Sequence, residues 1–208
     1  MRTKFIYFDL GRVLLDFDLD LMVSQMAKVA GIDSLALHST IFETDLDRSY
    51  ELGRITTDEF FATISETHGC SFDRERIELA TNDIFTEIPH SQEMVAWLRG
   101  LGYPLGILSN TCDGHWEFCR RRFPWMDEHF DVHVASHQVG AMKPDPAIYR
   151  AATDRAGCRP EEIVFVDDLL ENVEGARRFG FDAIHYTTGP EVEAALRERV
   201  QPVGQDIS

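Results

Sequence analysis

The chain has 208 residues, 44% of them hydrophobic and 27% charged, a composition that indicates a folded globular protein and excludes a disordered one. Its formal net charge of −16 repels phosphate-rich polymers and anionic lipid, so we expect no nucleic acid and no membrane as a partner. The sequence has no apolar stretch of the roughly 18 residues that span a bilayer and begins MRTKFIYFDL without a secretory leader, so we expect a cytoplasmic protein with its four cysteines reduced.

Five short apolar runs predict the strands of a single sheet. Each run is continuously apolar instead of alternating, which is typical of parallel strands covered on both faces. Helical patterns separate most of the runs; the one at 145–157 starts at Asp145-Pro146 and ends at Gly157. The alternation predicts an α/β fold, a doubly wound Rossmann-like parallel sheet with right-handed crossovers. The predicted strands are residues 4–9, 104–110, 132–136, 162–168 and 182–187.

The segment between the first two predicted strands departs from this alternation. Residues 19–88 contain no convincing strand and are patterned as four helices, the third of which starts with a capping box at Thr56 and Glu59. We therefore predict an inserted four-helix cap domain at 19–88 that covers one end of the sheet. The core domain would consist of residues 1–18 and 89–208.

Acidic residues stand where two of the predicted strands end. Asp9 ends the first strand, and Asp167 and Asp168 end the fourth. A carboxylate at the rim of an apolar core is costly without a cation or hydrogen bonds, and ligands of an open α/β sheet bind beyond the carboxyl ends of its strands. Three carboxylates that meet there would form an oxygen-rich site for Mg²⁺. The alternative is that each is an ordinary turn or capping residue.

Three further polar residues belong to the same edge of the sheet. Ser109 and Asn110 end the second strand, where a hydroxyl and free backbone N–H groups can hold phosphate oxygens or simply cap a helix. Lys143 lies between Gly140 and Pro144 on a short rigid loop, where it could neutralise phosphate charge or be an ordinary solvated lysine. Together with the carboxylates, these residues predict phosphoryl transfer to a nucleophilic Asp.

Four segments in chain order, FDLGRVL, ILSNT, GAMKPDPAIY and VFVDDLLEN, resemble the four ordered motifs of the haloacid dehalogenase (HAD) superfamily. The resemblance covers essentially the whole chain and is strongest to bacterial phosphatases whose first motif is FDLGxV, a group that includes glucose-1-phosphate phosphatase. It implies a Mg²⁺-dependent phosphoric monoester hydrolase that acts on a small phosphorylated metabolite through an aspartyl-phosphate. We expect a monomer or a homodimer.

The resemblance also implies which residues would hold the metal. Asp9 would be the nucleophile and would share Mg²⁺ with Asp168 and the backbone carbonyl of Gly11. Asp167 would lie just outside the metal or contact it through water, and Asn172, one helical turn further on, would brace that loop.

The same resemblance implies a phosphate-binding group. The Ser109 hydroxyl would donate a hydrogen bond to the phosphate, the Asn110 backbone would assist, and Gly11 would contribute its backbone. Lys143 would bridge the phosphate and Asp9 and so belongs to both the catalytic and the binding residues.

Gly11 departs from the pattern of the family. Most HAD phosphatases carry a second Asp at this position, which protonates the leaving group and later activates water. Such a general acid/base typically contributes about a hundred- to ten-thousand-fold to the rate. A dehalogenase also lacks this Asp but works without Mg²⁺, and the Asp167-Asp168 pair favours the metal-dependent reaction.

Three explanations of Gly11 stay open. The substrate could have a good leaving group, such as a sugar 1-phosphate, which needs less help from a proton donor. Another acid near the first two motifs could replace the missing one; the candidates are Asp16, Asp18, Asp113 and His115. The chain could also be a catalytically weak phosphate-binding or regulatory protein.

Overall fold

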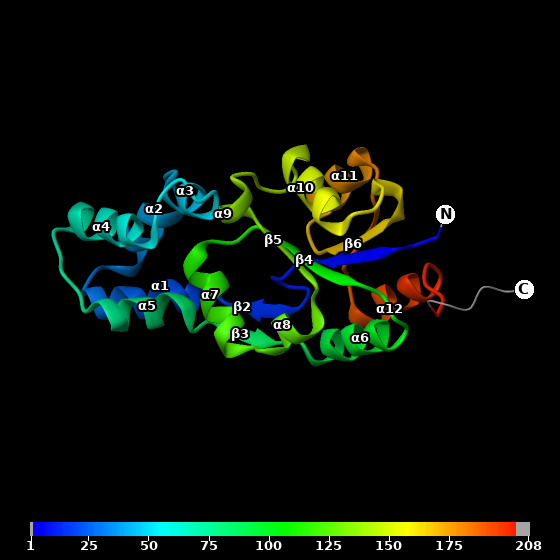
Figure 1. Cartoon of the computed structure of the whole chain (residues 1–208). Helices are drawn as coiled ribbons and strands as arrows, with labels where there is room; N and C mark the ends of the chain where they lie inside the picture. The colour runs from blue at the N-terminus through cyan, green and yellow to red at the C-terminus, as the bar shows by residue number, and fades with distance from the viewer. Residues whose placement is uncertain (1, 203–208) are drawn as a thin grey trace, which may run out of the picture.

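The computed structural model describes residues 2–202, and a five-stranded sheet lies at its centre (Figure 1). The strand order is β5-β4-β1-β6-β7, and every neighbouring pair is parallel. The strands are β1 (Phe5–Phe8), β4 (Leu105–Ser109), β5 (Val132–Ala135), β6 (Ile163–Asp167) and β7 (Asp182–His185). All five lie within the predicted runs, so the predicted α/β fold class with a parallel sheet is confirmed.

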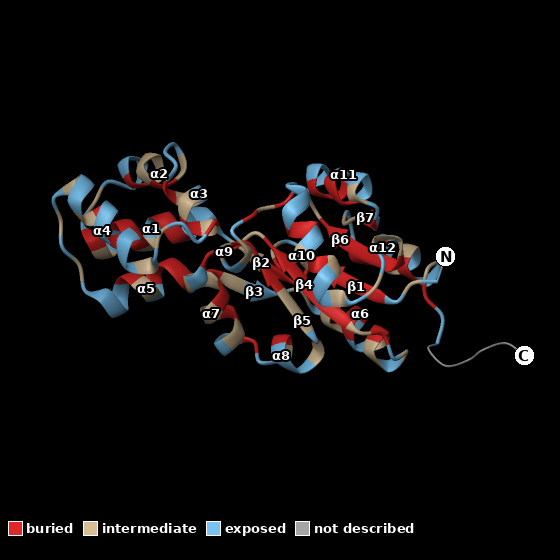
Figure 2. Ribbon diagram, turned by 45° about the horizontal axis from the view of Figure 1, so that its top comes forward, coloured by how far each residue is buried: buried red, intermediate tan, exposed pale blue. Residues whose placement is uncertain are grey.

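Helices cover both faces of this sheet, as expected for strands that are apolar throughout. Side chains of β1 alternate between two cores: Ile6 and Phe8 belong to one, Phe5 and Tyr7 to the other. The first core is closed by α6 (Pro89–Gly100) and α12 (Gly189–Arg197), the second by α10 (Pro146–Ala156) and α11 (Leu170–Phe179). Figure 2 shows that buried residues concentrate along the strands and on the helix sides that face them.

Residues 19–88 form a helical cap with an apolar core of its own. Four helices were expected here, and the structure has five among the described residues. The second predicted helix is divided because the chain leaves helical geometry at Glu43 and restarts at Asp45, where the Thr44 hydroxyl accepts a hydrogen bond from the Leu46 N–H. The helices are α1 (Leu19–Ala30), α2 (Ser34–Phe42), α3 (Leu46–Glu51), α4 (Thr57–His68) and α5 (Arg74–Asn82).

A two-stranded antiparallel ribbon joins the cap to the sheet domain. It consists of β2 (Leu15–Phe17) and β3 (Phe85–Glu87), with Phe17 paired opposite Phe85. The expectation that residues 19–88 contain no strand is therefore wrong at its C-terminal end. Three-residue strands are too short to show a periodic pattern in the sequence.

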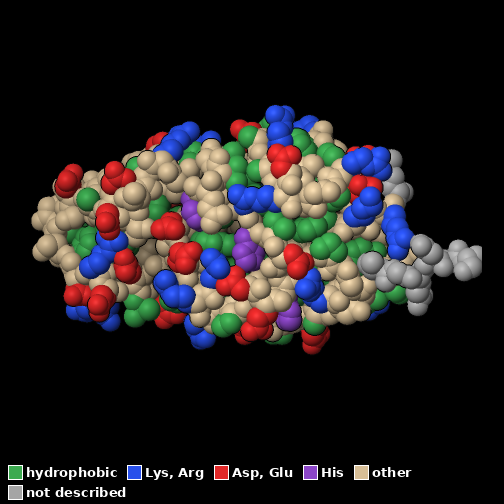
Figure 3. Space-filling view, in the orientation of Figure 1, with side chains coloured by type: hydrophobic (Ala, Val, Ile, Leu, Met, Phe, Trp, Pro, Cys, Tyr) green, Lys and Arg blue, Asp and Glu red, His purple; other side chains and the backbone are tan. Residues whose placement is uncertain are grey.

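The remaining elements follow β4, β5 and α10 along the chain. They are α7 (Asp113–Arg122), α8 (Trp125–His129), α9 (Ser136–Val139) and a short 3₁₀ helix, η1 (Pro160–Glu162). Across the described residues, no helix combines the length and apolar character needed to cross a bilayer. On the face seen in Figure 3, acidic and basic side chains of the described residues are interspersed, so that face has no broad positive surface of the kind that binds nucleic acid.

The C-terminal end of α3 is held firmly against the sheet domain. The Ser136 hydroxyl donates a hydrogen bond of 2.6 Å to the backbone carbonyl of Glu51, and the Gly114 N–H donates one of 3.1 Å to the Tyr50 hydroxyl. Gly53 adopts φ +65°, and its α-carbon approaches α9 so closely that a Cβ would lie 2.2 Å from the His137 carbonyl oxygen. This part of the cap is therefore fixed relative to the sheet.

We expect Gly53→Ala to weaken this contact between the cap and the sheet domain. A side chain at positive φ costs roughly 1 kcal/mol, and the close approach to His137 adds to that, for a total loss of about 1–3 kcal/mol in the free energy of unfolding. Gly31→Ala is the matched control because Gly31 has φ +68° and nothing within 4 Å of the position that a Cβ would take. Urea unfolding would measure both; equal losses would show that the contact at Gly53 contributes nothing.

Candidate active site

Three carboxylates meet at the edge of the sheet where β1 and β6 end. Asp9 directly follows β1, and Asp167 and Asp168 stand at the end of β6, its neighbour in the sheet. One oxygen from each carboxylate lies within 4.8 Å of the other two. Asp9 and Asp167 are buried, while Asp168 keeps some exposed surface. The strand order thus brings together the three acids that the sequence placed at strand ends.

Lys143 is buried at the centre of this cluster. Its ammonium lies 2.8 Å from Asp9 Oδ2 and 2.7 Å from Asp167 Oδ2, and it donates a third bond of 3.0 Å to the Leu108 carbonyl. Burial alone would lower the pKa of Lys143, but the charges of Asp167 and Asp9 outweigh it and raise the pKa above its ordinary value. The lysine is therefore a fixed cation within the site and not a solvated surface residue.

The polar residues after β4 hold the loop that carries Lys143. The side chain of Asn110 accepts a bond of 2.8 Å from the Lys143 N–H and donates one of 3.0 Å to the Lys143 carbonyl. Ser109 is buried, and its hydroxyl donates to the Asn110 carbonyl at 3.3 Å. Sequence reasoning assigned only the backbone of Asn110 to the site, and the pairing of its side chain with Lys143 was not foreseen.

Asp167 lies deeper in the site than the sequence suggested. It shares Lys143 with Asp9, and both of its oxygens accept hydrogen bonds from the Asn172 amide, at 3.1 and 3.2 Å. The Leu169 N–H donates a further bond of 2.8 Å. Asn172 lies where the sequence expected it to brace this loop, and its target is the Asp167 carboxylate.

The residues of this cluster fit a divalent cation. Three carboxylates and one ammonium leave an excess of two negative charges, and the donors are the hard oxygens that Mg²⁺ prefers. Burial raises the pKa of Asp9 above its ordinary range; Lys143 opposes this shift, and Asp167 adds to it. Burial and the neighbouring Asp167 also raise the pKa of Asp168. A bound cation would relieve this excess of negative charge.

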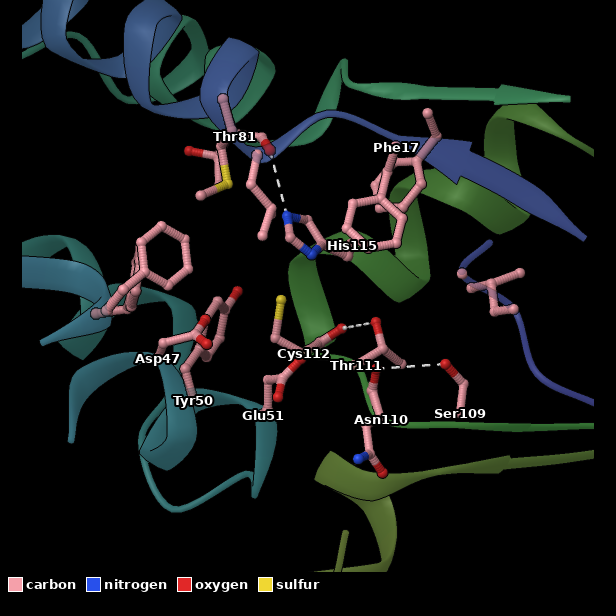
Figure 4. A pocket seen from close by; sticks show the side chains of 17 residues that line it. Phe17, Asp47, Tyr50, Glu51, Thr81, Ser109, Asn110, Thr111, Cys112 and His115 are labelled. Atoms are coloured by element: carbon pink, nitrogen blue, oxygen red, sulfur yellow. Dashed lines mark hydrogen bonds between the residues drawn. The ribbon is translucent and has the colours of Figure 1, made fainter. Parts of the chain in front are cut away.

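A cavity of about 140 Å³ lies between this edge of the sheet and the cap (Figure 4). The loops after β1 and β4 form one side of it, and all five cap helices, α1 to α5, contribute side chains to the other side. Most of the lining is apolar or aromatic. The lining residues are Leu10, Gly11, Phe17, Leu19, Met22, Phe42, Asp47, Tyr50, Glu51, Phe60, Thr81, Phe85, Ser109, Asn110, Thr111, Cys112 and His115.

The space beside Gly11 is filled by an aromatic ring. A Cβ at Gly11 would lie 2.6 Å from Cε1 of Phe17. The ring is held by Phe85, whose centroid is 6.0 Å away, and by the guanidinium of Arg12 at 4.6 Å. The second acid of the first motif is thus absent from the sequence, and its place in the structure is occupied.

Comparison with known proteins identifies the family of this chain. A family model for haloacid dehalogenase-like hydrolases matches residues 6–180. The chain belongs to the haloacid dehalogenase-like hydrolases. This confirms the predicted family and the assignment as a hydrolase.

Individual relatives of this hydrolase are named as phosphatases. It is 27% identical over 204 residues to a D-ribitol-5-phosphate phosphatase from Bacteroides thetaiotaomicron, a match that covers 90% of this chain and 94% of that enzyme. A glyceraldehyde 3-phosphate phosphatase from Methanothermobacter thermautotrophicus is 33% identical over 122 residues, 58% of this chain and 52% of that protein. These names agree with the predicted phosphoric monoester hydrolase.

A solved structure resembles this chain over most of its length. A HAD family enzyme from Bacteroides thetaiotaomicron in complex with magnesium and inorganic phosphate has a TM-score of 0.79 and 26% sequence identity. The match covers 88% of this chain and 93% of that one.

Three of the four acids considered as replacements for the missing Asp lie elsewhere. Asp16 pairs with Arg12, and its carboxylate also accepts from the Phe17 N–H. Asp18 caps α1 by accepting from the Leu21 N–H. The Asp113 side chain is 62% exposed. None of the three lines the cavity, so none is placed to protonate a leaving group there.

His115 does line the cavity but is not available as an acid at neutral pH. Burial lowers its pKa to about 4, and its Nε2 lies 3.2 Å from the Thr81 carbonyl. A carbonyl only accepts, so the proton of the neutral ring stays on Nε2 and is donated to Thr81. This nitrogen supports the cap rather than a substrate.

Two carboxyl groups that line the cavity were missed by sequence reasoning. Asp47 and Glu51 lie one turn apart on α3 and both face the cavity (Figure 4). Within the stretch ETDLDRSYELG they are indistinguishable from exposed acids on an acidic protein. The available signal was their spacing of four residues, the same as that of the buried Leu46 and Tyr50.

The neutral state of His115 predicts a pH-dependent stability. Its pKa is lower in the folded state than the ordinary value of 6.5, so the unfolded state binds the proton first and stability falls as the pH falls from about 6.5 to 4. Relative to His115→Gln, the wild type should lose about 2–3 kcal/mol of unfolding free energy between pH 7 and 4.5. Urea titrations at the two pH values would measure this difference; a difference that does not change with pH would show that His115 is not buried in its neutral form.

Proposed function

We propose that this hydrolase is a magnesium-dependent phosphatase that acts on a small phosphorylated metabolite through a phosphorylated Asp9. The observation that carries the proposal is the buried group of Asp9, Asp167 and Lys143 beside a small cavity. A nucleophile, a cation and a set of metal-compatible oxygens lie together there, next to a space that only a small leaving group can fill. The named phosphatase relatives and the magnesium–phosphate complex of a similar enzyme support the same chemistry.

Each residue of the site has its own role in the proposed phosphoryl transfer. Asp9 attacks phosphorus, and the P–O bond to the leaving group breaks as the bond to the Asp9 carboxylate forms. Lys143 holds the attacking carboxylate in place and offsets the charge of the phosphoryl oxygens, while the Ser109 hydroxyl donates to one of them. Mg²⁺, held by Asp9, Asp168 and the Gly11 carbonyl, would add positive charge to the transferring group.

The lining of the cavity limits the substrate. Among the described residues that line it, none is Lys or Arg, and two acidic side chains, Asp47 and Glu51, face it from the cap. Of these two, Asp47 is ionised at neutral pH, since burial raises its pKa only to about 6. A second phosphate or a carboxylate on the substrate would therefore be repelled from the cap side. We infer a substrate with one phosphate and an uncharged body. The leaving-group argument from Gly11 makes a sugar 1-phosphate the first member of that class to test.

Activity should depend on both Asp9 and Mg²⁺. We expect p-nitrophenyl phosphate hydrolysis to be lost when EDTA removes divalent ions and to return with added Mg²⁺. Asp9→Asn should lower kcat by about a thousand-fold or more because it removes the nucleophile, whereas Asp154→Asn, at an exposed position, should leave kcat unchanged.

The alternative function is a regulatory protein that binds phosphate without turnover. It would be favoured if the wild type showed no hydrolysis while inorganic phosphate still bound in the presence of Mg²⁺ by calorimetry. Hydrolysis that survives in Asp9→Asn would contradict both functions at this site.

A panel of phosphate esters would test the inferred substrate class. We expect glucose 1-phosphate and ribitol 5-phosphate to have a higher kcat/KM than 3-phosphoglycerate and fructose 1,6-bisphosphate, since the last two carry further negative charge. The difference should shrink in Asp47→Asn, where part of the repulsion is removed. Equal kcat/KM values across the panel would contradict selection by charge.

A further inference from the structure

Proton transfer to the leaving group has no donor in the first motif, and the geometry of the site limits where a replacement can lie. In an in-line displacement the leaving group departs on the side of phosphorus opposite the attacking Asp9. Asp9 stands on the sheet edge, so the leaving group points away from the sheet into the cavity under the cap. The proton donor must therefore be a titratable side chain that lines this cavity.

Five titratable side chains line the cavity, and three of them are unsuitable as proton donors. His115 is neutral with its Nε2 proton donated to Thr81. Burial raises the pKa of the Cys112 thiol to about 12, and burial also raises the pKa of the Tyr50 hydroxyl, which is already paired with Thr57 and Gly114.

The two remaining groups are the carboxyls of α3, and they differ in their surroundings. Burial raises the pKa of Asp47 to about 6, so this carboxyl has lost its proton at neutral pH. Burial, with contributions from Asp47 and Asp9 and opposed by Lys143 and Arg48, raises the pKa of Glu51 to about 8. Glu51 thus keeps its proton at neutral pH and is close enough to Asp9 and Lys143 to feel their charges.

The position of Glu51 is fixed although it belongs to the cap. Its backbone carbonyl accepts from Ser136, the preceding Tyr50 accepts from Gly114, and Gly53 packs on α9. Within the described part of the chain, no group forms a hydrogen bond with the Glu51 carboxyl, which leaves it available to a substrate. Figure 4 shows Glu51 entering the cavity from α3 and facing the segment that follows β4.

We propose that Glu51 is the general acid and base of this hydrolase, in place of the Asp that is absent at position 11. The proposal rests on the proposed phosphatase function. In the first step the leaving-group oxygen takes the Glu51 proton as its bond to phosphorus breaks, which yields the alcohol, phospho-Asp9 and a Glu51 carboxylate. In the second step this carboxylate takes a proton from water, the water oxygen bonds to phosphorus, and the bond to Asp9 breaks, releasing phosphate.

Two aryl phosphates of similar shape test the first step. Phenoxide is a more basic leaving group than p-nitrophenoxide and needs the proton more. Glu51→Gln should lower kcat/KM for phenyl phosphate by about a hundred-fold or more, and kcat/KM for p-nitrophenyl phosphate by less than about ten-fold. Glu43→Gln, an exposed position on the cap outside the cavity, should change neither value. Equal losses with both substrates, or no loss with either, would overturn the proposal.

Rapid mixing tests the second step. With p-nitrophenyl phosphate and Mg²⁺, Glu51→Gln should release one equivalent of p-nitrophenol per active site in a burst, followed by slow turnover, because water attack on phospho-Asp9 lacks its base. Asp47→Asn, which leaves the Glu51 carboxyl in place as the base, should show no burst. Absence of a burst in Glu51→Gln would overturn the assignment as base.

The same experiments separate this inference from the phosphatase function on which it rests. If wild type hydrolyses p-nitrophenyl phosphate with Mg²⁺ and Asp9, the function holds whatever Glu51→Gln does. If the wild type shows no such hydrolysis, the proposed phosphatase function is wrong, and the assignment of Glu51 falls with it. Thermal unfolding of Glu51→Gln would confirm that the variant is folded before its rates are compared.

Discussion

The ammonium of Lys143 is the interaction on which the active site depends. Two buried carboxylates, Asp9 and Asp167, lie within 2.8 Å of it, and neither could remain ionised in an apolar environment without a partner. Removing one partner of such a buried pair typically costs about 3–5 kcal/mol because the other charge is left uncompensated. The contact with Lys143 therefore favours the ionised form of Asp9, the proposed nucleophile, against the effect of burial and holds its carboxyl group in one orientation.

The order of the strands makes this contact possible. β1 lies between β4 and β6, so the residues that follow all three strands converge on one point at their carboxyl ends. Asp9 and Asp167 come from adjacent strands, and the Asn110 side chain after β4 fixes the backbone of Lys143 from the other side. Residues that are more than 150 positions apart in the chain thus act as one unit, since a parallel sheet places every strand end at the same edge.

Much of this arrangement could be predicted from the sequence because it depends on local patterns. Continuous apolar runs marked the strands, and the polar residues after them marked the site. The pairing of Lys143 with Asp167 could not be predicted, since it depends on how two distant loops meet. The β2–β3 ribbon was missed because three residues carry no periodic signal, and Glu51 was missed because an acid on a short helix has the same pattern whether it faces solvent or a cavity.

The ribbon and α3 together explain how the chain can dispense with the usual second acid. The ribbon places Phe17 against Gly11, which closes the position of that acid and extends the apolar lining of the cavity. A proton donor can then approach only from the cap side. The bonds from Ser136 and Gly114 hold α3 at that side, so a donor there needs little further ordering when a substrate binds. A carboxyl group surrounded by apolar side chains and other acids retains its proton, and those surroundings also admit only an uncharged leaving group. The side chains that α3 contributes to the cavity would thus both select the leaving group and protonate it.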